Sequence, residues 1–233
     1  MLGGVASVAG TRQTFGAVAA AALLIAVWAA RTPAARPERP QPLSMLFRAF
    51  GDRRMLLSMW LVVLPALLFG TLAVLGPLRL NALGWGSVAI GAVWLVSGAI
   101  ESGNNIVIGR LSDRYGPLLP VRIGLLATVV ACALLPWPQT AWVFALVLVF
   151  AEISFGTFYT PGMTLLTHAA EDRSLDYGYA FAIINLAWAP GQSLGSAVGG
   201  AVAQATSDAV PYYTLCGIAL LTLAGLWRSR SSS

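Results

Sequence analysis

Long apolar segments alternate with short polar connections along almost the whole chain. Seven segments are rich enough in apolar residues to cross a bilayer as a helix, which takes roughly 20 such residues. Their approximate ranges are 14–30, 55–77, 86–108, 118–135, 140–165, 178–203 and 210–227. The pattern predicts an all-α membrane protein with about seven transmembrane helices.

The longest polar connection, residues 31–54, contains four prolines and six arginines. It is too polar and too interrupted by proline to cross a membrane, so we expect an exposed linker. The linker divides the chain into residues 1–30, with the first helix, and residues 55–233, with six helices.

Composition excludes several classes of protein. The chain is 58% hydrophobic and 10% charged, whereas soluble domains carry about 25% charged residues. The net charge of +5 does not predict nucleic-acid binding, because the arginines lie in short connections and form no basic face. Cys132, Cys216 and His168 have no metal-ligand spacing, so we expect no metal and no cofactor. No nucleophile is paired with a base, which argues against an enzyme.

The arginines predict the orientation in the membrane. If residues 31–54 are cytoplasmic and the spans alternate, twelve arginines lie inside and two, Arg12 and Arg79, lie outside. Cytoplasmic connections are enriched in arginine and lysine, so this orientation is favoured and the C-terminus is cytoplasmic. We expect a multi-pass protein of the cell membrane.

Polar side chains are concentrated in the third, fifth and sixth spans. They are Ser97, Glu101, Asn104 and Asn105 in the third, Glu152, Tyr159 and Thr160 in the fifth, and Asn185, Trp188 and Gln192 in the sixth. Their spacing places each set on one helical face. Ionisable residues within a membrane usually face an interior pathway or a partner, so we expect these three spans to line a pathway. The first, fourth and seventh spans are almost purely apolar and are expected to face lipid.

Structural roles remain alternatives for each of these residues. Glu101 either serves transport, or near the cytoplasmic end it reaches the membrane interface or pairs with Arg110 or Arg114. Glu152 either binds a proton, cation or substrate or makes a structural hydrogen bond. The amides of Asn104, Asn185 and Gln192 could join helices, and the aromatic rings of Tyr159 and Trp188 could be packing.

Small residues and prolines mark two further features of the last spans. Gly191, Gly195 and Gly199 stack on one face of the sixth span and predict close helix packing rather than a phosphate-binding loop. The pairs Pro161-Gly162 and Pro190-Gly191 predict breaks or kinks that would suit hinges.

The beginning and the end of the chain resemble each other. Gly3-Gly4, a polar patch, Phe15 and an apolar run ending at Arg31 correspond to Gly199-Gly200, a polar patch, Tyr212-Tyr213 and an apolar run ending at Arg228. Parallel repeats of a helix bundle are one known construction of transporters. If the repeat is six helices, the chain holds one whole unit and the last helix of the preceding unit.

A charged octapeptide separates the third and fourth spans, GRLSDRYG, with Gly109, Arg110, Asp113, Arg114 and Gly116. We expect it to form a tight turn, with Asp113 at the start of the following helix. It resembles the G-x-L-x-D-R-x-G-R-K signature of the major facilitator superfamily, although Pro117-Leu118 replaces the basic residues that often follow.

Other segments support this resemblance across most of the chain. Thr160-Pro161-Gly162 and residues 185–200 are similar to the tenth and eleventh helices of drug- and metabolite-exporting members. The resemblance implies the last helix of the N-terminal half followed by the six-helix C-terminal half, with the octapeptide as a gating motif. The first five helices of the family fold have no counterpart, so we expect a fragment, a split gene product or a half that needs the missing N-terminal half.

The resemblance implies transport of a small solute by alternating access, in which two halves rock about a central site. Efflux with proton coupling is the form we expect, with the bilayer and the N-terminal half as partners. The alternative is a truncated membrane module that assembles with other proteins and transports nothing.

Overall fold

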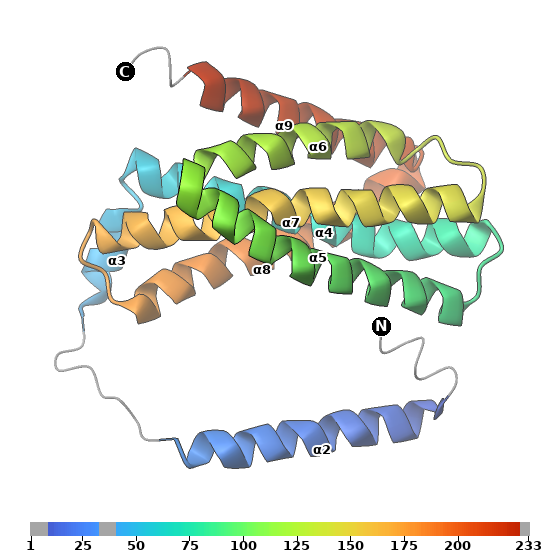
Figure 1. The fold of residues 1–233 in the computed structure, drawn as a ribbon, viewed down its shortest axis with the longest axis horizontal. Helices are drawn as coiled ribbons and strands as arrows, with labels where there is room; N and C mark the ends of the chain where they lie inside the picture. The colour runs from blue at the N-terminus through green and yellow to red at the C-terminus, as the bar shows by residue number, and fades with distance from the viewer. Residues whose placement is uncertain (1–8, 33–40, 229–233) are drawn as a thin grey trace.

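The computed structural model describes residues 9–32 and 41–228 and consists of α-helices joined by short connections (Figure 1). The helices are α2 (Thr11–Ala30), α3 (Leu43–Ala49), α4 (Arg53–Ala82), α5 (Ser87–Tyr115), α6 (Leu118–Leu134), α7 (Ala141–Glu171), α8 (Tyr177–Ala205) and α9 (Ala209–Arg228). Each expected span corresponds to one long helix, and α3 is a short addition within the linker. The repeat residues Gly3 and Gly4, linker residues 33–40 and Arg230 lie outside the described residues.

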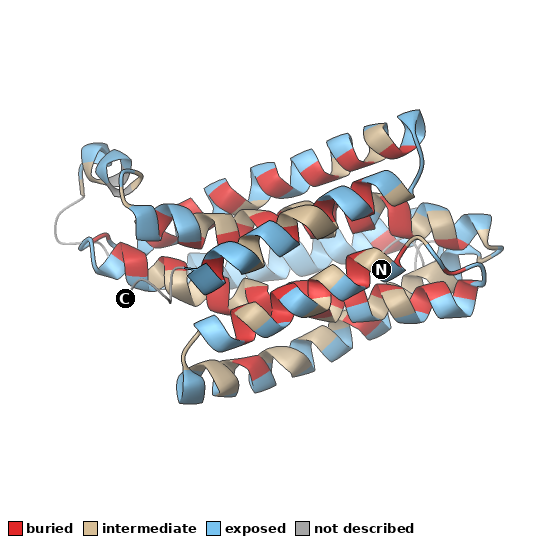
Figure 2. Ribbon diagram, turned by 90° about the horizontal axis from the view of Figure 1, so that it is seen from above, coloured by how far each residue is buried: buried red, intermediate tan, exposed pale blue. Residues whose placement is uncertain are grey.

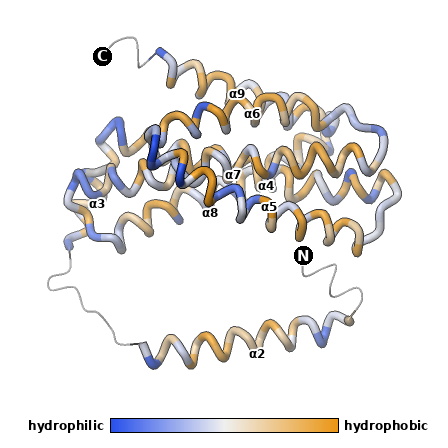
Figure 3. The backbone as a smooth tube through the Cα atoms, in the orientation of Figure 1, coloured by the Kyte–Doolittle hydropathy of each residue, from blue (hydrophilic) through white to orange (hydrophobic). Residues whose placement is uncertain are grey.

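Four of the described helices have the length and hydropathy of membrane spans. Among the described residues, α2, α4, α7 and α9 are long and apolar enough to cross a bilayer. Helices α5 and α8 each contain 29 residues but include the polar side chains described below, and α6 has 17 residues. Figure 3 shows apolar residues along the helices and hydrophilic residues mainly at helix ends and in the second half of α5. The predicted fold class, an all-α membrane protein, is therefore confirmed.

Helix α7 is the centre of the bundle and packs against α4, α5, α6 and α8. Its buried phenylalanines, Phe144, Phe155 and Phe158, are among the largest fully enclosed side chains. Helices α6 and α9 pack against each other on one side of the bundle, as Figure 1 shows. Buried residues are concentrated on the faces that meet inside the bundle (Figure 2).

The closest helix pair is α4 and α8, which run parallel. The glycines of the small-residue stripe lie against successive turns of α4: Gly191 against Val63 and Ala66, Gly195 against Leu67, and Gly199 against Thr71. A Cβ atom at Gly195 would overlap the backbone carbonyl of Leu67. Thr71 donates a hydrogen bond to the carbonyl of Gly195 at 3.0 Å, and Ser196 donates to that of Gly70 at 3.1 Å. The stripe therefore allows the two backbones to touch.

Helix α2 has no extensive packing against the other described helices and lies apart from the bundle (Figure 1). Its apolar side chains, including Leu23, Leu24 and Trp28, are 67–75% exposed. Residues of this kind have no favourable contact with water, so either lipid or another helix covers them in the membrane.

The expected turn at the octapeptide is wrong, and so are the expected breaks at Pro161-Gly162 and Pro190-Gly191. The octapeptide is not a turn, because α5 continues to Tyr115 and only Gly116, with a φ of 83°, and Pro117 form the connection. Asp113 consequently lies in the last turn of α5 rather than at the start of α6. Helices α7 and α8 also continue without a break through Pro161 and Pro190. Packing against α4 holds both helices together, since Gly162 and Gly191 each approach an α4 carbonyl.

The glycine stripe gives a stability prediction. Gly195→Ala forces a methyl group onto the Leu67 carbonyl, so the free energy of unfolding should fall by about 1–3 kcal/mol, the usual effect of overpacking. Reversible unfolding in mixed micelles measures this change. Gly217→Ala in α9 is the control, because a Cβ there meets nothing within 4 Å and alanine favours the helix. Equal losses in both variants would contradict the packing described here.

Candidate functional site

Polar side chains of α5 form a row that faces α7. Ser97 donates a hydrogen bond to a carboxylate oxygen of Glu152 at 2.7 Å, and Asn104 donates to the hydroxyl of Thr157 at 2.9 Å. About one turn further along α7, Thr160 donates a hydrogen bond to the side-chain oxygen of Asn105 at 2.8 Å. The numbering rises together on both helices, so α5 and α7 run parallel and the row follows their interface.

Glu152 lies at the most enclosed point of this row, and its side chain is 5% exposed. In the described part of the chain it forms no ion pair, and Ser97 is the hydrogen-bond donor that it contacts. Insertion scales put the free-energy cost of a charged residue at the centre of a membrane helix at about 2.5–3.5 kcal/mol. A carboxyl group in this position is therefore suited to binding a proton or a cation.

Glu101 lies in the same row, between Ser97 and Asn104. Its side chain packs onto α7 at Gly156, where a Cβ atom would collide with a carboxylate oxygen of Glu101. It is close enough to Glu152 and Tyr159 for electrostatic interaction. The alternative in which Glu101 pairs with Arg110 or Arg114 is wrong: nine and thirteen residues of one helix separate them, about 14 and 20 Å along the axis.

Aromatic side chains from three helices lie beside the polar row. Trp188 of α8 packs against Tyr159 of α7 with ring centroids 4.6 Å apart and against Phe69 of α4 at 5.8 Å. Phe69 in turn meets Phe155 edge-on at 5.5 Å. Tyr159 and Trp188 are half-buried, so the cluster presents aromatic surface together with a phenol and an indole N–H group.

The polar residues of α8 are only partly joined to this arrangement. The indole of Trp188 donates to the side-chain oxygen of Gln192 at 3.1 Å, and Gln192 is exposed. Asn185 is also exposed and donates to the backbone carbonyl of Phe181 in its own helix at 2.9 Å. Asn185 is therefore on the same exposed side of α8, and its side-chain hydrogen bond stays within α8 and does not reach the polar row.

The octapeptide lies at the end of α5. Arg110, Asp113 and Arg114 are exposed, and in the described residues none of them forms an ion pair. The guanidinium of Arg114 lies 5.3 Å from the ring centroid of Tyr115. The N–H of Gly116 donates to the carbonyl of Ser112 at 2.8 Å and closes the helix. The charges of the motif are thus presented outward.

Comparison with known protein families shows to which family the chain belongs. The family model of the Major Facilitator Superfamily matches residues 1–191, which include the octapeptide and the whole polar row. The chain belongs to the major facilitator superfamily. A search of curated proteins found no match to it.

Membership of the superfamily assigns solute transport in general to this chain and makes it an integral, multi-pass membrane protein. Members of this superfamily are transporters rather than enzymes. Among the described residues, no group of three or more His, Cys, Asp or Glu side chains could hold a metal ion.

A second contact region, not expected from the sequence, connects the linker to the α7–α8 loop. Arg173 pairs with Asp52 at 2.9 Å, while the exposed pair Arg54–Asp172 is longer, at 3.9 Å. Gln41 donates to the carbonyl of Ser174 at 2.7 Å and accepts from the backbone N–H of Asp176 at 3.0 Å. Partners more than 115 residues apart give no local sequence signal.

Sequence reasoning also missed Phe69 and Thr157. Phe69 is one apolar residue among many in α4, and nothing in the sequence separates it from packing residues. Thr157 could have been found, because it stands five residues after Glu152 and three before Thr160, among the polar residues of the same span.

The Asn104–Thr157 hydrogen bond gives a quantitative test of the polar row. In a double-mutant cycle with Asn104→Ala and Thr157→Val, we expect a coupling free energy of about 0.6 kcal/mol, the average for such bonds in membranes. Unfolding in mixed micelles supplies the four free energies. The control cycle combines Thr157→Val with Ser102→Ala instead of Asn104→Ala. Ser102 is exposed and donates a hydrogen bond within its own helix, so this cycle should show no coupling. Equal coupling in the two cycles would refute the contact.

Proposed function

We propose that the chain is the C-terminal part of a secondary transporter that exports a small solute across the cell membrane by alternating access. Buried Glu152 carries this proposal, because a carboxyl group hydrogen-bonded to Ser97 between two membrane helices has little structural justification. Superfamily membership supports transport in general, and the site geometry supports the more specific mechanism.

In this proposal, the carboxyl groups of Glu152 and Glu101 couple transport to protons. Glu152 exchanges the proton, and Glu101, which lies within electrostatic range, makes that exchange sensitive to its own charge. A solute would contact the neighbouring side chains that combine aromatic surface with hydrogen-bonding groups, namely Tyr159, Trp188, Gln192 and Asn104. Asn185 takes a peripheral place on the same side of α8.

Helix α5 would transmit the state of the polar row to the gating motif. Ser97 and Asp113 lie 16 residues apart in one uninterrupted helix, which is about 24 Å along its axis. When Glu152 changes protonation, its bond to Ser97 changes, and α5 moves as a rigid body relative to α7. Gly109, Arg110, Asp113, Arg114 and Gly116 then meet or leave the other half of the transporter.

The partner would be an N-terminal half, on the same polypeptide or on a separate one. Exposed α2, within residues 1–30, would be the last helix of that half, residues 31–54 the cytoplasmic linker, and residues 55–233 the C-terminal half. The arginine distribution favours a cytoplasmic C-terminus. The bilayer covers the remaining apolar surface.

Glu152→Gln tests the coupling. Glutamine keeps the size and can accept the Ser97 hydrogen bond, but it cannot exchange a proton. In proteoliposomes that contain both halves, we expect flux driven by a pH gradient to fall about tenfold or more, as for loss of an essential intramembrane carboxyl group. Exchange of solute without a gradient should continue.

Glu171→Gln is the matched control, since it changes an exposed carboxyl group at the end of the same helix. Gradient-driven flux that is equal in the Glu152 variant and the unchanged protein would refute the coupling role. If the unchanged protein transports nothing when both halves are present, the alternative of a non-transporting module is favoured.

Asp113→Asn tests the gate. The carboxylate of Asp113 stands at the negative end of the α5 dipole, so its removal should leave stability unchanged or raise it by about 0.3–1 kcal/mol. Flux should nevertheless fall by about tenfold, because a contact that favours one of the two states is lost. Initial transport rate and unfolding free energy are measured on the same preparation. Asp176→Asn, at the start of α8, is the control. Unchanged flux would remove Asp113 from the mechanism.

A further inference from the structure

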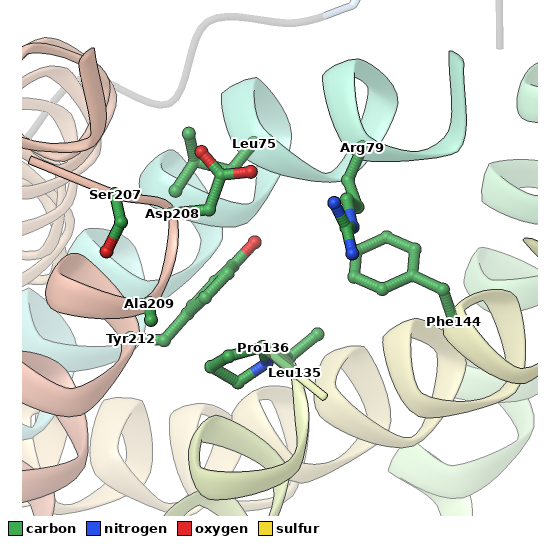
Figure 4. Close-up of a pocket in the computed structure, with 9 residues that line it drawn as sticks. All are labelled: Leu75, Arg79, Leu135, Pro136, Phe144, Ser207, Asp208, Ala209 and Tyr212. Carbon is green, nitrogen blue, oxygen red and sulfur yellow. The ribbon is translucent and has the colours of Figure 1, made fainter. Parts of the chain in front are cut away.

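The end of the bundle opposite the octapeptide contains a pocket that the transport mechanism does not use. It lies between the last turns of α4, the α6–α7 connection and the beginning of α9, with a volume of about 400 Å³ (Figure 4). Phe144, in its wall, precedes Glu152 by eight residues, which is about 12 Å along α7. By the orientation proposed above, this end faces the outside of the cell.

Tyr212 stands in the middle of this pocket. Its side chain is 3% exposed, and among the described residues its hydroxyl group has no hydrogen-bond partner. Figure 4 shows the hydroxyl pointing into the space between Asp208 and Arg79. Buried hydroxyl groups are rarely left unpaired because their desolvation is unfavourable, so this group indicates a bound polar molecule.

Two opposite charges flank the hydroxyl. Arg79 donates one hydrogen bond to the carbonyl of Pro138 at 3.2 Å, which fixes its guanidinium and leaves other N–H groups directed at the pocket. Asp208 lines the opposite side, and the described structure contains no ion pair between Asp208 and Arg79. The pocket therefore offers an anion-binding side and a cation-binding side.

Apart from Ser207, the remaining wall is apolar. Leu75, Leu135 and Phe144 enclose the pocket below the charged groups. A ligand that satisfies all three features carries an anionic oxygen group, a primary ammonium group and a short apolar portion.

We propose that this pocket binds such a primary-ammonium zwitterion, with its anionic oxygens on Arg79 and Tyr212 and its ammonium group on Asp208. The site is separate from the polar row and does not depend on the transport proposal. Two sources share this chemistry: a free α-amino acid with an apolar side chain, and the phosphoethanolamine head group of a lipid.

Binding to the full chain in nanodiscs distinguishes the sources. In phosphatidylcholine nanodiscs, we expect L-leucine to bind saturably and to raise the melting temperature, whereas 3-methylbutylamine and 4-methylpentanoate, which each lack one charge, do not. If the ligand is the head group, exchange of phosphatidylcholine for phosphatidylethanolamine raises the melting temperature without leucine. Neither assay requires flux, so its result is independent of transport.

Tyr212→Phe is the decisive variant, because it removes only the unpaired hydroxyl group. We expect at least about tenfold weaker leucine binding, or loss of the phosphatidylethanolamine effect, since a hydrogen bond to a charged group is lost. The unliganded variant should be at least as stable as the unchanged protein. Asp208→Asn should weaken the same response.

Tyr213→Phe is the matched control, because Tyr213 is adjacent and exposed and does not line the pocket. The proposal is overturned if neither leucine nor phosphatidylethanolamine has an effect. It is also overturned if Tyr212→Phe and Tyr213→Phe respond alike, or if both single-charge analogues bind as well as leucine.

Discussion

The direct backbone contact between α4 and α8 is the constraint on which the bundle depends. Lipid tails are as apolar as the side chains of membrane helices, so burial from lipid gives no hydrophobic driving force. Membrane helices therefore associate through close packing and hydrogen bonds. Here three glycines at four-residue intervals on α8 receive successive turns of α4, and Thr71 and Ser196 donate to carbonyls across the contact. Helix α7 then packs against this pair, which explains why it continues through Pro161 without a break.

The α5–α7 contact has a different character. Only Ser97 and Ile108 of α5 are buried, and the helix is joined to α7 by side-chain hydrogen bonds rather than by backbone contact. Such bonds exchange with water or a solute at little free-energy cost, whereas touching backbones have no alternative partners. If one helix of the bundle moves, the contacts favour α5 moving against a fixed unit of α4, α7 and α8.

The sequence predicts the helices well because each span is long, apolar and bounded by prolines or charges. It also predicts that Ser97, Glu101 and Asn104 share one face of α5, since helical spacing determines which residues of a helix lie together. It fails where the answer depends on partners distant in the chain. The Gln41 contacts, for example, join residues more than 130 apart. The sequence also does not show that α5 continues through GRLSDRY to Tyr115. The sequence shows that Tyr212 and Tyr213 are adjacent, but it does not indicate that the hydroxyl group of Tyr212 is buried and unpaired.

These differences place the two candidate binding regions in different mechanical settings. The polar row lies at the α5–α7 interface, which is held by exchangeable hydrogen bonds. A ligand bound there can therefore change the position of α5. The Tyr212 pocket is built from α4, α7, α9 and the α6–α7 and α8–α9 connections, beside the firmly packed core cluster that contains Leu75, Leu135 and Phe144. A ligand there contacts no residue of α5. Occupancy of the pocket should therefore stabilise the bundle without selecting one position of α5, because a ligand shifts a conformational equilibrium only through contacts that differ between the two states.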